Sequence, residues 1–156
     1  MILKLFEAEL RRDEGVRYSP YLDTADPPKH TVGVGHNIDV SPLPAGWEFP
    51  LSDAQVNQLL ERDVSTTLAK LDKVLPWWRN MDEVRQRVIA NMCFNLGVGS
   101  AAAGTGLLGF KNTLAAMQRG SYGVAAAGMK ASKWYDQVGA RGVRLCKAME
   151  TGVMPS

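Results

Sequence analysis

Hydrophobic side chains at helical spacing open the chain. Leu3, Phe6 and Leu10 recur at i, i+3 and i+7, and charged residues occupy several of the positions between them. This pattern predicts a short amphipathic helix that ends near Glu14, where Gly15 can serve as the C-terminal stop. Such a helix turns one apolar face to a core and one charged face to water.

The hydrophobic pattern changes over residues 16–36. This segment contains tyrosine, threonine and valine, which favour strands, and it is interrupted by prolines and glycines. We expect a small antiparallel sheet here, with a turn at Asp26-Pro27-Pro28. Residues 39–50 contain three prolines and no hydrophobic period, which indicates a loop.

Helical periodicity returns after Ser52. Ser52 is a good N-cap and Gln55 follows three residues later, which is the spacing of a capping box. Apolar residues then continue at helical spacing to Leu75, and Pro76 ends the pattern. These signals predict one long helix that connects a β-containing front lobe to a helical back lobe.

The last part of the chain is predicted to be predominantly helical. A strong apolar pattern begins near Asp82 and is ended by Gly97, and residues 97–109 are rich in glycine and alanine, as in a loop. Further helices are expected at about 107–118, 121–131 and 140–150. Together the elements predict a mostly helical α+β fold with one small antiparallel sheet near the N-terminus.

The composition suits a single domain. The chain has 156 residues, of which 46% are hydrophobic, so it can bury a core without disulfides or metal ions. Its two cysteines, Cys93 and Cys146, lie within helical patterns and lack a Cys-x-x-Cys spacing. We therefore expect two reduced core residues. A catalytic thiol is the alternative, but no base stands near either cysteine in the sequence.

Charge is unevenly distributed along the chain. Residues 111–156 carry seven basic and two acidic side chains, whereas residues 1–110 carry eleven basic and fourteen acidic ones. A basic end suits a polyanion such as a bacterial wall or a nucleic acid, and a solvated helical face is the alternative. The first residues lack the apolar core of a signal peptide and no segment reaches the length of a membrane span. We therefore expect a protein made in the cytoplasm, without stable membrane insertion.

The residues best suited to chemistry are two carboxylates and a hydroxyl near the predicted sheet. Paired carboxylates on a small scaffold are the minimal equipment for acid/base cleavage of a glycosidic bond. Glu14 would donate a proton, Asp23 would stay charged, and Thr31 would help to orient a water molecule. Each also has an ordinary interpretation, as a salt bridge at a helix end, a turn residue and a β-branched strand residue.

Other signals are weaker. His30 and His36, near Asp39, do not have a familiar zinc spacing and no third ligand is evident. We expect these histidines to lie in turns or to pair with carboxylates, and we expect no metal and no cofactor. The segment Gly33-Val34-Gly35 begins like a dinucleotide-binding motif, but Ile38 stands at its third glycine position and no βαβ unit surrounds it.

The front motifs taken together resemble a known family. Asp-Glu-Gly at 13–15, Tyr-x-Asp-Thr at 21–24 and Thr-x-Gly-x-Gly-His at 31–36 stand in the order typical of phage-type lysozymes. These are the endolysins of glycoside hydrolase family 24, the class of the T-even phage lysozyme. Later segments also fall in family order, at 91–97, 109–114 and 132–137. The resemblance therefore spans nearly the whole chain.

The resemblance implies a fold and an activity. The fold is a single lysozyme-like domain over residues 1–156, with a β-containing lobe at about 14–60 and a helical lobe made of 1–13 and 61–156. The activity is that of a muramidase, which hydrolyses the β-1,4 bond between N-acetylmuramic acid and N-acetylglucosamine in bacterial peptidoglycan, with inversion. By the same analogy the protein is a monomer without cofactors. As an endolysin it waits in the host cytoplasm until a holin admits it to the periplasm and cell wall, and a virion-borne lysozyme delivered from outside is the alternative.

The resemblance also assigns roles to single residues. Glu14 matches the general acid of the family, Asp23 its second carboxylate, and Thr31 the threonine that helps to hold the attacking water. Arg141 matches an arginine that pairs with the catalytic glutamate. The positions that match cleft-shaping residues are Gly35, His36 and Phe94.

Three other functions are carried forward as alternatives. A lytic transglycosylase cuts the same bond without water and needs a single glutamate, so the presence of Asp23 and Thr31 argues against it. A non-catalytic module that binds the wall or belongs to a virion is the alternative from another class, and the intact candidate residues disfavour it. Nucleic-acid binding by the basic C-terminal region is a weaker alternative, and we expect no nucleic-acid partner.

Overall fold

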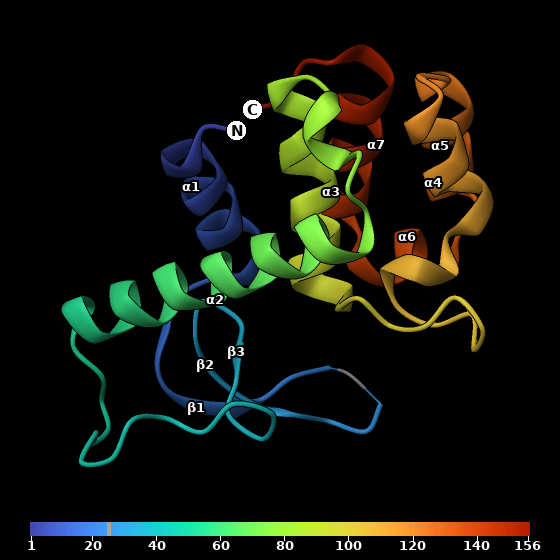
Figure 1. Cartoon of the computed structure of the whole chain (residues 1–156). Coiled ribbons are helices and arrows are strands. Elements are labelled where there is room, and N and C mark those ends of the chain that lie inside the picture. Colours follow the sequence, from blue (N-terminus) through green and yellow to red (C-terminus); the bar gives the residue numbers. More distant parts are fainter. Residues whose placement is uncertain (25) are drawn as a thin grey trace. The chain divides into compact units, whose positions relative to one another are not determined.

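A computed structural model describes residues 1–24 and 26–156 and has the mostly helical α+β architecture expected from the sequence (Figure 1). The helices are α1 (Leu3–Glu14), α2 (Asp53–Val74), α3 (Glu83–Leu96), α4 (Lys111–Gln118), α5 (Tyr122–Lys130), α6 (Lys133–Val138) and α7 (Ala140–Thr151). The strands are β1 (Arg17–Leu22), β2 (His30–Gly33) and β3 (His36–Asn37), and two 3-10 turns are η1 (Trp78–Asn80) and η2 (Leu107–Gly109). None of the helices in these described ranges is both long enough and apolar enough to cross a membrane.

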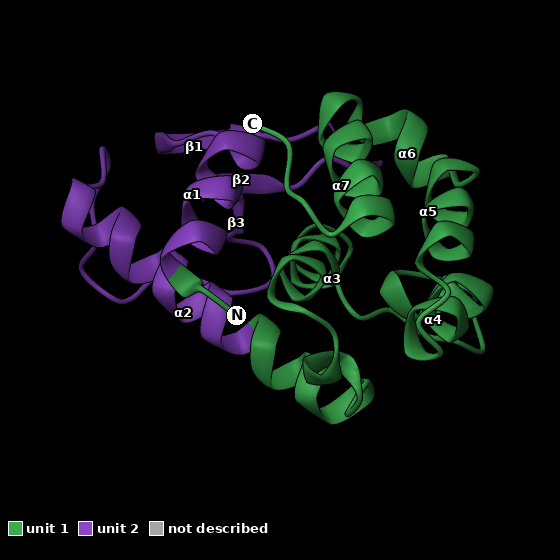
Figure 2. Ribbon diagram, turned by 90° about the horizontal axis from the view of Figure 1, so that it is seen from above, with its two compact units in different colours: residues 1–3, 67–156 green, residues 4–66 purple. Residues whose placement is uncertain are grey.

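The described residues form two compact units, which Figure 2 colours separately. Unit 2 contains residues 4–66, and unit 1 contains residues 1–3 and 67–156. The boundary falls within α2. Most of α1 groups with the sheet in unit 2. The single domain over residues 1–156 and its two predicted lobes stay predictions.

Helix α1 carries the apolar face that its sequence period predicts, with one exception. Phe6 and Leu10 are fully buried, but Leu3 at the first turn is 49% exposed. The helix ends as expected, because Gly15 takes a φ of 74° and its N–H donates a hydrogen bond to the Arg11 carbonyl at 3.0 Å. Glu14 is thus the last helical residue before the sheet.

The three strands of unit 2 form an antiparallel sheet in the order β1-β2-β3. Tyr21 pairs with Thr31 and Leu22 with His30 across β1 and β2, and Thr31 also pairs with Asn37 of β3. The turn expected at Asp26-Pro27-Pro28 lies between β1 and β2. The sequence analysis did not separate β3, because a strand of two residues shows no alternation of polar and apolar positions.

The N-terminal part of α2 packs on this sheet. Its start is the predicted capping box, in which Ser52 N–H donates to Gln55 Oε1 at 2.9 Å and Gln55 N–H donates to Ser52 Oγ at 3.1 Å. A Cβ placed on Gly33 of β2 would lie 3.7 Å from the Leu59 side chain and 3.9 Å from that of Val56. Helix and strand are therefore in van der Waals contact, which buries the apolar face of α2.

A buried ion pair ties β3 to α2 within unit 2. The His36 side chain is 2% exposed, and its Nδ1 lies 2.6 Å from Asp63 Oδ2. Its Nε2 lies 2.7 Å from the Ser41 carbonyl oxygen. Burial alone lowers the pKa of His36, but the hydrogen bond and the charge of Asp63 outweigh that effect, so the pKa is raised above its ordinary value.

Helix α3 forms the core of unit 1. Asp82 caps its N-terminus by accepting a hydrogen bond from the Arg85 N–H, and Gly97 ends it with a φ of 73°, as the sequence predicts. The residues from Gln86 to Cys93 are all buried, so the helix is enclosed on every side rather than on one face. Figure 2 views α3 nearly end-on, with α7 packed beside it.

Both cysteines are buried core residues with free thiols, as expected. Cys93 lies in α3 and Cys146 in α7. Burial raises the pKa of each thiol to about 11, against a smaller lowering by Lys70 at Cys93 and by Lys130 at Cys146. Such thiols are almost wholly protonated near neutral pH, so neither is activated as a nucleophile.

The short elements of unit 1 differ from the expectation. Helix α4 begins at Lys111, after the 3-10 turn η2, rather than at residue 107. Helix α6 was missed: it has six residues and begins where the Ser132 hydroxyl accepts a hydrogen bond from the Tyr135 N–H at 3.2 Å. Six residues make fewer than two helical turns, too few for an apolar period to be recognised.

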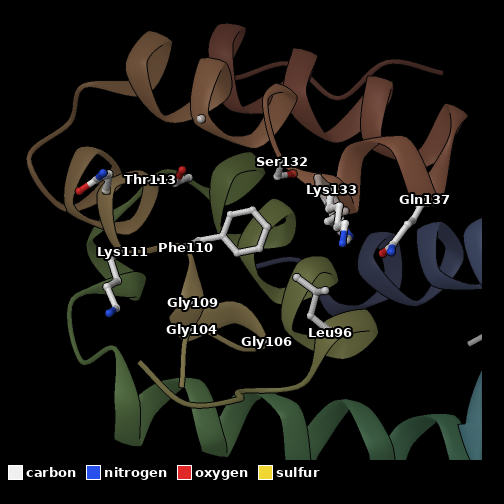
Figure 3. A pocket seen from close by; sticks show the side chains of 13 residues that line it. Leu96, Gly104, Gly106, Gly109, Phe110, Lys111, Thr113, Ser132, Lys133 and Gln137 are labelled. Atoms are coloured by element: carbon white, nitrogen blue, oxygen red, sulfur yellow. The ribbon is translucent and has the colours of Figure 1, made fainter. Parts of the chain in front are cut away.

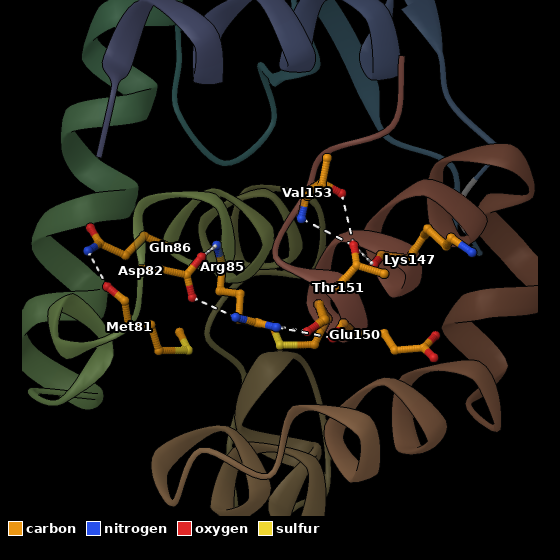
Figure 4. Close-up of polar contacts among 9 residues, drawn as sticks. Met81, Asp82, Arg85, Gln86, Lys147, Glu150, Thr151 and Val153 are labelled. Atoms are coloured by element: carbon orange, nitrogen blue, oxygen red, sulfur yellow. Dashed lines mark hydrogen bonds and ion pairs between the residues drawn. The ribbon is translucent and has the colours of Figure 1, made fainter.

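The Arg85 side chain fastens the end of α7 to the start of α3 (Figure 4). Its Nε donates to the Met149 carbonyl at 2.7 Å, and its Nη2 donates to the Glu150 carbonyl at 3.1 Å. Its Nη1 lies 2.9 Å from Asp82 Oδ1, and its guanidinium carbon lies 3.8 Å from the centre of the Tyr122 ring. One cation therefore satisfies carbonyls at a helix C-terminus, where positive charge is favourable.

We predict that Arg85→Ala lowers the free energy of unfolding by about 2–3 kcal/mol, because charge-assisted hydrogen bonds to partly buried carbonyls are lost. Urea denaturation followed by circular dichroism measures this change. The control is Arg119→Ala, since Arg119 is exposed and its side chain bonds only to the Ser121 hydroxyl among the described residues. An equal loss in the two variants would contradict the role given to Arg85.

The His36–Asp63 pair should make stability depend on pH in a defined direction. The pKa of His36 is raised in the folded protein, so its stabilising effect is fully present below the unfolded value of about 6.5. The effect is lost as the pH rises through the folded pKa. We therefore expect Asp63→Asn to destabilise the protein more at pH 6 than at alkaline pH, as measured by denaturation at each pH. A cost that stays constant or grows toward alkaline pH would rule out this linkage.

Candidate functional site

The three predicted catalytic residues all lie in unit 2. Glu14 ends α1, Asp23 directly follows β1, and Thr31 lies in β2. The hairpin pairing continues past β1, because the Asp23 N–H donates to the Lys29 carbonyl at 2.9 Å. Since Tyr21 pairs with Thr31, strand alternation places the side chains of Asp23 and Thr31 on the same face of the hairpin.

The Glu14 carboxyl group packs against the backbone of Gly35. A Cβ added to Gly35 would lie 2.9 Å from both Cδ and Oε2 of Glu14, closer than side chains approach one another. Gly35 also has a φ of 67°, a conformation that favours glycine. Two features therefore favour glycine at this position in the turn between β2 and β3. One is the positive φ, and the other is the close approach of the Glu14 carboxyl group.

The main chain of Lys29 orients the other two candidates. Its N–H donates to Asp23 Oδ1 at 2.8 Å, and its carbonyl accepts from the Thr31 hydroxyl at 3.2 Å. Asp23 is half-buried, and Thr31 is 4% exposed. The main chain of one hairpin residue thus contacts both side chains and helps to set their directions. The sequence analysis missed this role because every residue carries the same main-chain groups.

Tyr21 is a further residue whose role the sequence analysis missed. Burial raises the pKa of its hydroxyl, the negative charge of Glu14 and then of Asp23 raises it further, and Arg17 opposes them. The Arg17 guanidinium lies 4.8 Å from the centre of the tyrosine ring. Tyr21 therefore stands in the field of both candidate carboxylates. Its position two residues before Asp23 in the same hairpin is the signal that could have found it.

His36 supports the turn between β2 and β3, and its predicted cleft-shaping role stays a prediction. Both of its ring nitrogens are engaged, by Asp63 and by the Ser41 carbonyl, which fixes β3 next to Gly35. The exposed His30 pairs with Asp39 at 3.2 Å, so both histidines pair with carboxylates, as expected. No group of three or more histidine, cysteine, aspartate or glutamate side chains suited to a metal occurs within residues 1–24 and 26–156.

The two remaining predicted site residues, Phe94 and Arg141, belong to unit 1. Phe94 is half-buried near the end of α3. Arg141 is 6% exposed, and its Nε donates to Asn91 Oδ1 at 2.9 Å, which sets the direction of the guanidinium within this unit. The pairing of Arg141 with Glu14 and the cleft-shaping role of Phe94 stay predictions.

Unit 1 also contains an aromatic pocket of about 630 Å³ (Figure 3). The rings of Phe110 and Trp134 meet edge to face with centroids 6.2 Å apart, and Trp134 Nε1 donates to Asn95 Oδ1 at 3.0 Å. Lys111 and Lys133 also line the pocket. Aromatic faces with nearby cations suit a sugar or a peptide that carries carboxylates. The sequence pattern does not predict that the segments around Phe110 and Trp134 enclose one pocket, because they meet only through the packing of the helices.

Comparisons with known proteins agree with the motif order found in the sequence. The chain matches the phage lysozyme family over residues 11–147. It is 31% identical to the pre-baseplate central spike protein Gp5 of Enterobacteria phage T4, over 94% of this chain and 28% of that protein's length. It is 25% identical to two probable T4-type lysozymes, 1 and 2, of Dictyostelium discoideum, over 93% of this chain and 93% of each. The chain belongs to the phage lysozyme family.

Proposed function

We propose that the protein is a peptidoglycan hydrolase that cleaves the β-1,4 bond between N-acetylmuramic acid and N-acetylglucosamine. The observation that carries the proposal is the site in unit 2, where the Glu14 carboxyl packs on Gly35 and the Lys29 main chain orients Asp23 and Thr31. Membership of the phage lysozyme family supports the same reading. A carboxylic acid, a second carboxylate and a hydroxyl are the groups that acid/base hydrolysis of a glycoside requires.

In the proposed reaction Glu14 is the general acid. It gives its proton to the glycosidic oxygen as the bond from that oxygen to the anomeric carbon breaks. The negative charge of Asp23 faces the positive charge that develops on the sugar. Desolvation by bound substrate would favour the protonated form of Glu14, which this step requires.

Water completes the proposed reaction. Asp23 and the Thr31 hydroxyl orient a water molecule on the face of the sugar opposite the leaving group, and Asp23 takes the proton of this water as it attacks. The new hydroxyl therefore has the inverted configuration. The cycle leaves Glu14 ionised and Asp23 protonated, and proton exchange with solvent restores both.

The biological setting of the proposal is the wall of a bacterial host. In the endolysin form, the protein is a monomer that accumulates in the host cytoplasm and reaches the periplasm when a holin opens the membrane. The similarity to the T4 central spike protein favours a second setting, in which the lysozyme is carried by the virion. The chain spans 28% of that relative's length, so a virion-borne form would be one module of a larger assembly.

The first prediction from the site is that Glu14→Gln lowers hydrolysis of purified peptidoglycan by about 10²–10⁴-fold, the usual contribution of a general acid. Mass spectrometry of the released fragments measures this loss. Glu7→Gln is the matched control, because it makes the same change two turns earlier on α1 and should keep full activity.

The products decide between the candidate functions. Hydrated reducing muramic acid ends that depend on Glu14 support the proposed hydrolase. Anhydro ends would replace it by a transglycosylase, and the absence of release by the unaltered protein would favour a binding module.

The second prediction concerns the packing of Gly35 on Glu14. Gly35→Ala should lower activity by about 100-fold, because the added Cβ must displace the Glu14 carboxyl by roughly an ångström. The control is Gly46→Ala in the same unit, since Gly46 has a φ of 85° and a Cβ there would meet nothing within 4 Å. In both variants alanine occupies a position with positive φ, which costs about 1–2 kcal/mol of backbone strain. Thermal unfolding should therefore show similar losses of stability. Equal activities in the two variants would refute the role of this contact.

A further inference from the structure

Unit 1 contains a second cavity that the proposed site does not use. It has a volume of about 530 Å³ and lies between α5 and α7. Small and apolar residues form much of its lining, including Ala126 and Ala127 of α5 and Val143 and Cys146 of α7. We call it the basic groove. Its other lining residues are Gly123, Lys130, Tyr135, Arg144, Lys147, Glu150 and Pro155.

The charged residues of the basic groove are mostly cations. Lys130 is the last residue of α5, and Arg144 and Lys147 are three residues apart on α7, on one face of that helix. Glu150 is the single carboxylate of the lining, which therefore carries a net charge of +2. A lining with this charge attracts an anion of about two negative charges.

The two lysines are available to a ligand. Both are exposed, and in the described part of the chain neither ammonium group has an ion pair or a hydrogen bond. The positive charge of Lys130 acts on the Cys146 thiol, which lies in the wall of the groove. Lys130, at the end of α5, therefore lies near the residues of α7 that line the groove. Figure 4 shows Lys147 on α7.

The lining also suits an organic body attached to an anionic group. Tyr135 is half-buried and packs against α7, since a Cβ on Gly142 would lie 3.1 Å from its Cδ2. An aromatic ring and small apolar side chains are the usual surface for the carbon face of a sugar, and the Glu150 carboxylate can accept hydrogen bonds from hydroxyl groups. The volume lies within the range of sites for small organic ligands.

We propose that the basic groove binds a phosphorylated sugar, with the phosphate between Lys130 and Lys147. A phosphate monoester carries about −1.5 to −2 charges near pH 7, which suits a lining with net positive charge. Each lysine ammonium binds phosphate as a compact point charge. The sugar then lies along Tyr135 and the alanines of α5.

The basic groove shares no lining residue with the aromatic pocket or with the site in unit 2. The proposal therefore does not rest on the hydrolase activity, and Glu14→Gln protein can be used to test it without cleavage of any ligand. If the groove does not bind the ligand, the proposed hydrolase activity is not contradicted. If variants of the site in unit 2 lose hydrolysis, the proposed binding in the groove is not contradicted.

The test is an NMR titration of ¹⁵N-labelled Glu14→Gln protein with glucose 6-phosphate at physiological ionic strength. We expect saturable shifts of backbone amides in α5 and α7, no such shifts with glucose, and binding of inorganic phosphate that is weaker by about tenfold or more. The absence of saturable shifts in these two helices would overturn the proposal. Inorganic phosphate that binds as tightly as the ester would also overturn it, because the sugar would then contribute nothing.

A pair of matched double variants separates a site from general attraction. Lys130→Gln with Lys147→Gln should weaken binding of glucose 6-phosphate by about tenfold or more, because two charge-assisted hydrogen bonds are lost. Lys111→Gln with Lys133→Gln removes the same charge from the aromatic pocket of the same unit and should leave affinity within about twofold. Equal weakening by the two pairs would show nonspecific electrostatic attraction and would contradict a site in the basic groove. Thermal unfolding checks that these exposed substitutions leave the fold intact.

Discussion

The close contact between the Glu14 carboxyl and the backbone of Gly35 is the constraint on which the proposed site depends. It brings the last residue of α1 to the turn between β2 and β3, and a side chain at position 35 would displace the Glu14 carboxyl. The same turn presents His36 to Asp63, so a buried ion pair anchors the turn to α2. A helix end, a turn and a second helix of unit 2 therefore support one carboxyl group, which is the kind of rigid support that a catalytic acid requires.

The second half of the site is held by the main chain. Lys29 donates to Asp23 and accepts from Thr31, so the direction of both side chains follows from the register of the hairpin. A side chain placed by backbone hydrogen bonds loses little further freedom when substrate binds. Tyr21 adds a hydroxyl within the field of both carboxylates, which links the two halves of the site electrostatically.

The sequence could predict the helices that have a long repeat of apolar residues or a clear capping residue. The capping box at Ser52 and the stop at Gly97 are found where they were expected, whereas the six residues of α6 and the two of β3 are too short to leave a pattern. The sequence could identify Glu14, Asp23 and Thr31 as candidate catalytic residues for two reasons. Carboxylates and hydroxyls are the side chains that such chemistry requires, and the order of these residues resembles that of a known family. The role of Lys29 could not be predicted from the sequence, because it uses main-chain atoms that every residue has. The basic groove could not be predicted either, because it forms only when two helices pack together.

The most direct test of the proposed chemistry is the configuration of the freshly released sugar. Proton NMR can follow the anomeric signal of muramic acid ends during cleavage of a soluble peptidoglycan fragment, before mutarotation equilibrates it. Water held by Asp23 and Thr31 attacks opposite the leaving group, so the account predicts that the α anomer appears first. Initial release of the β anomer would mean retention, and would contradict the roles given to Asp23 and Thr31.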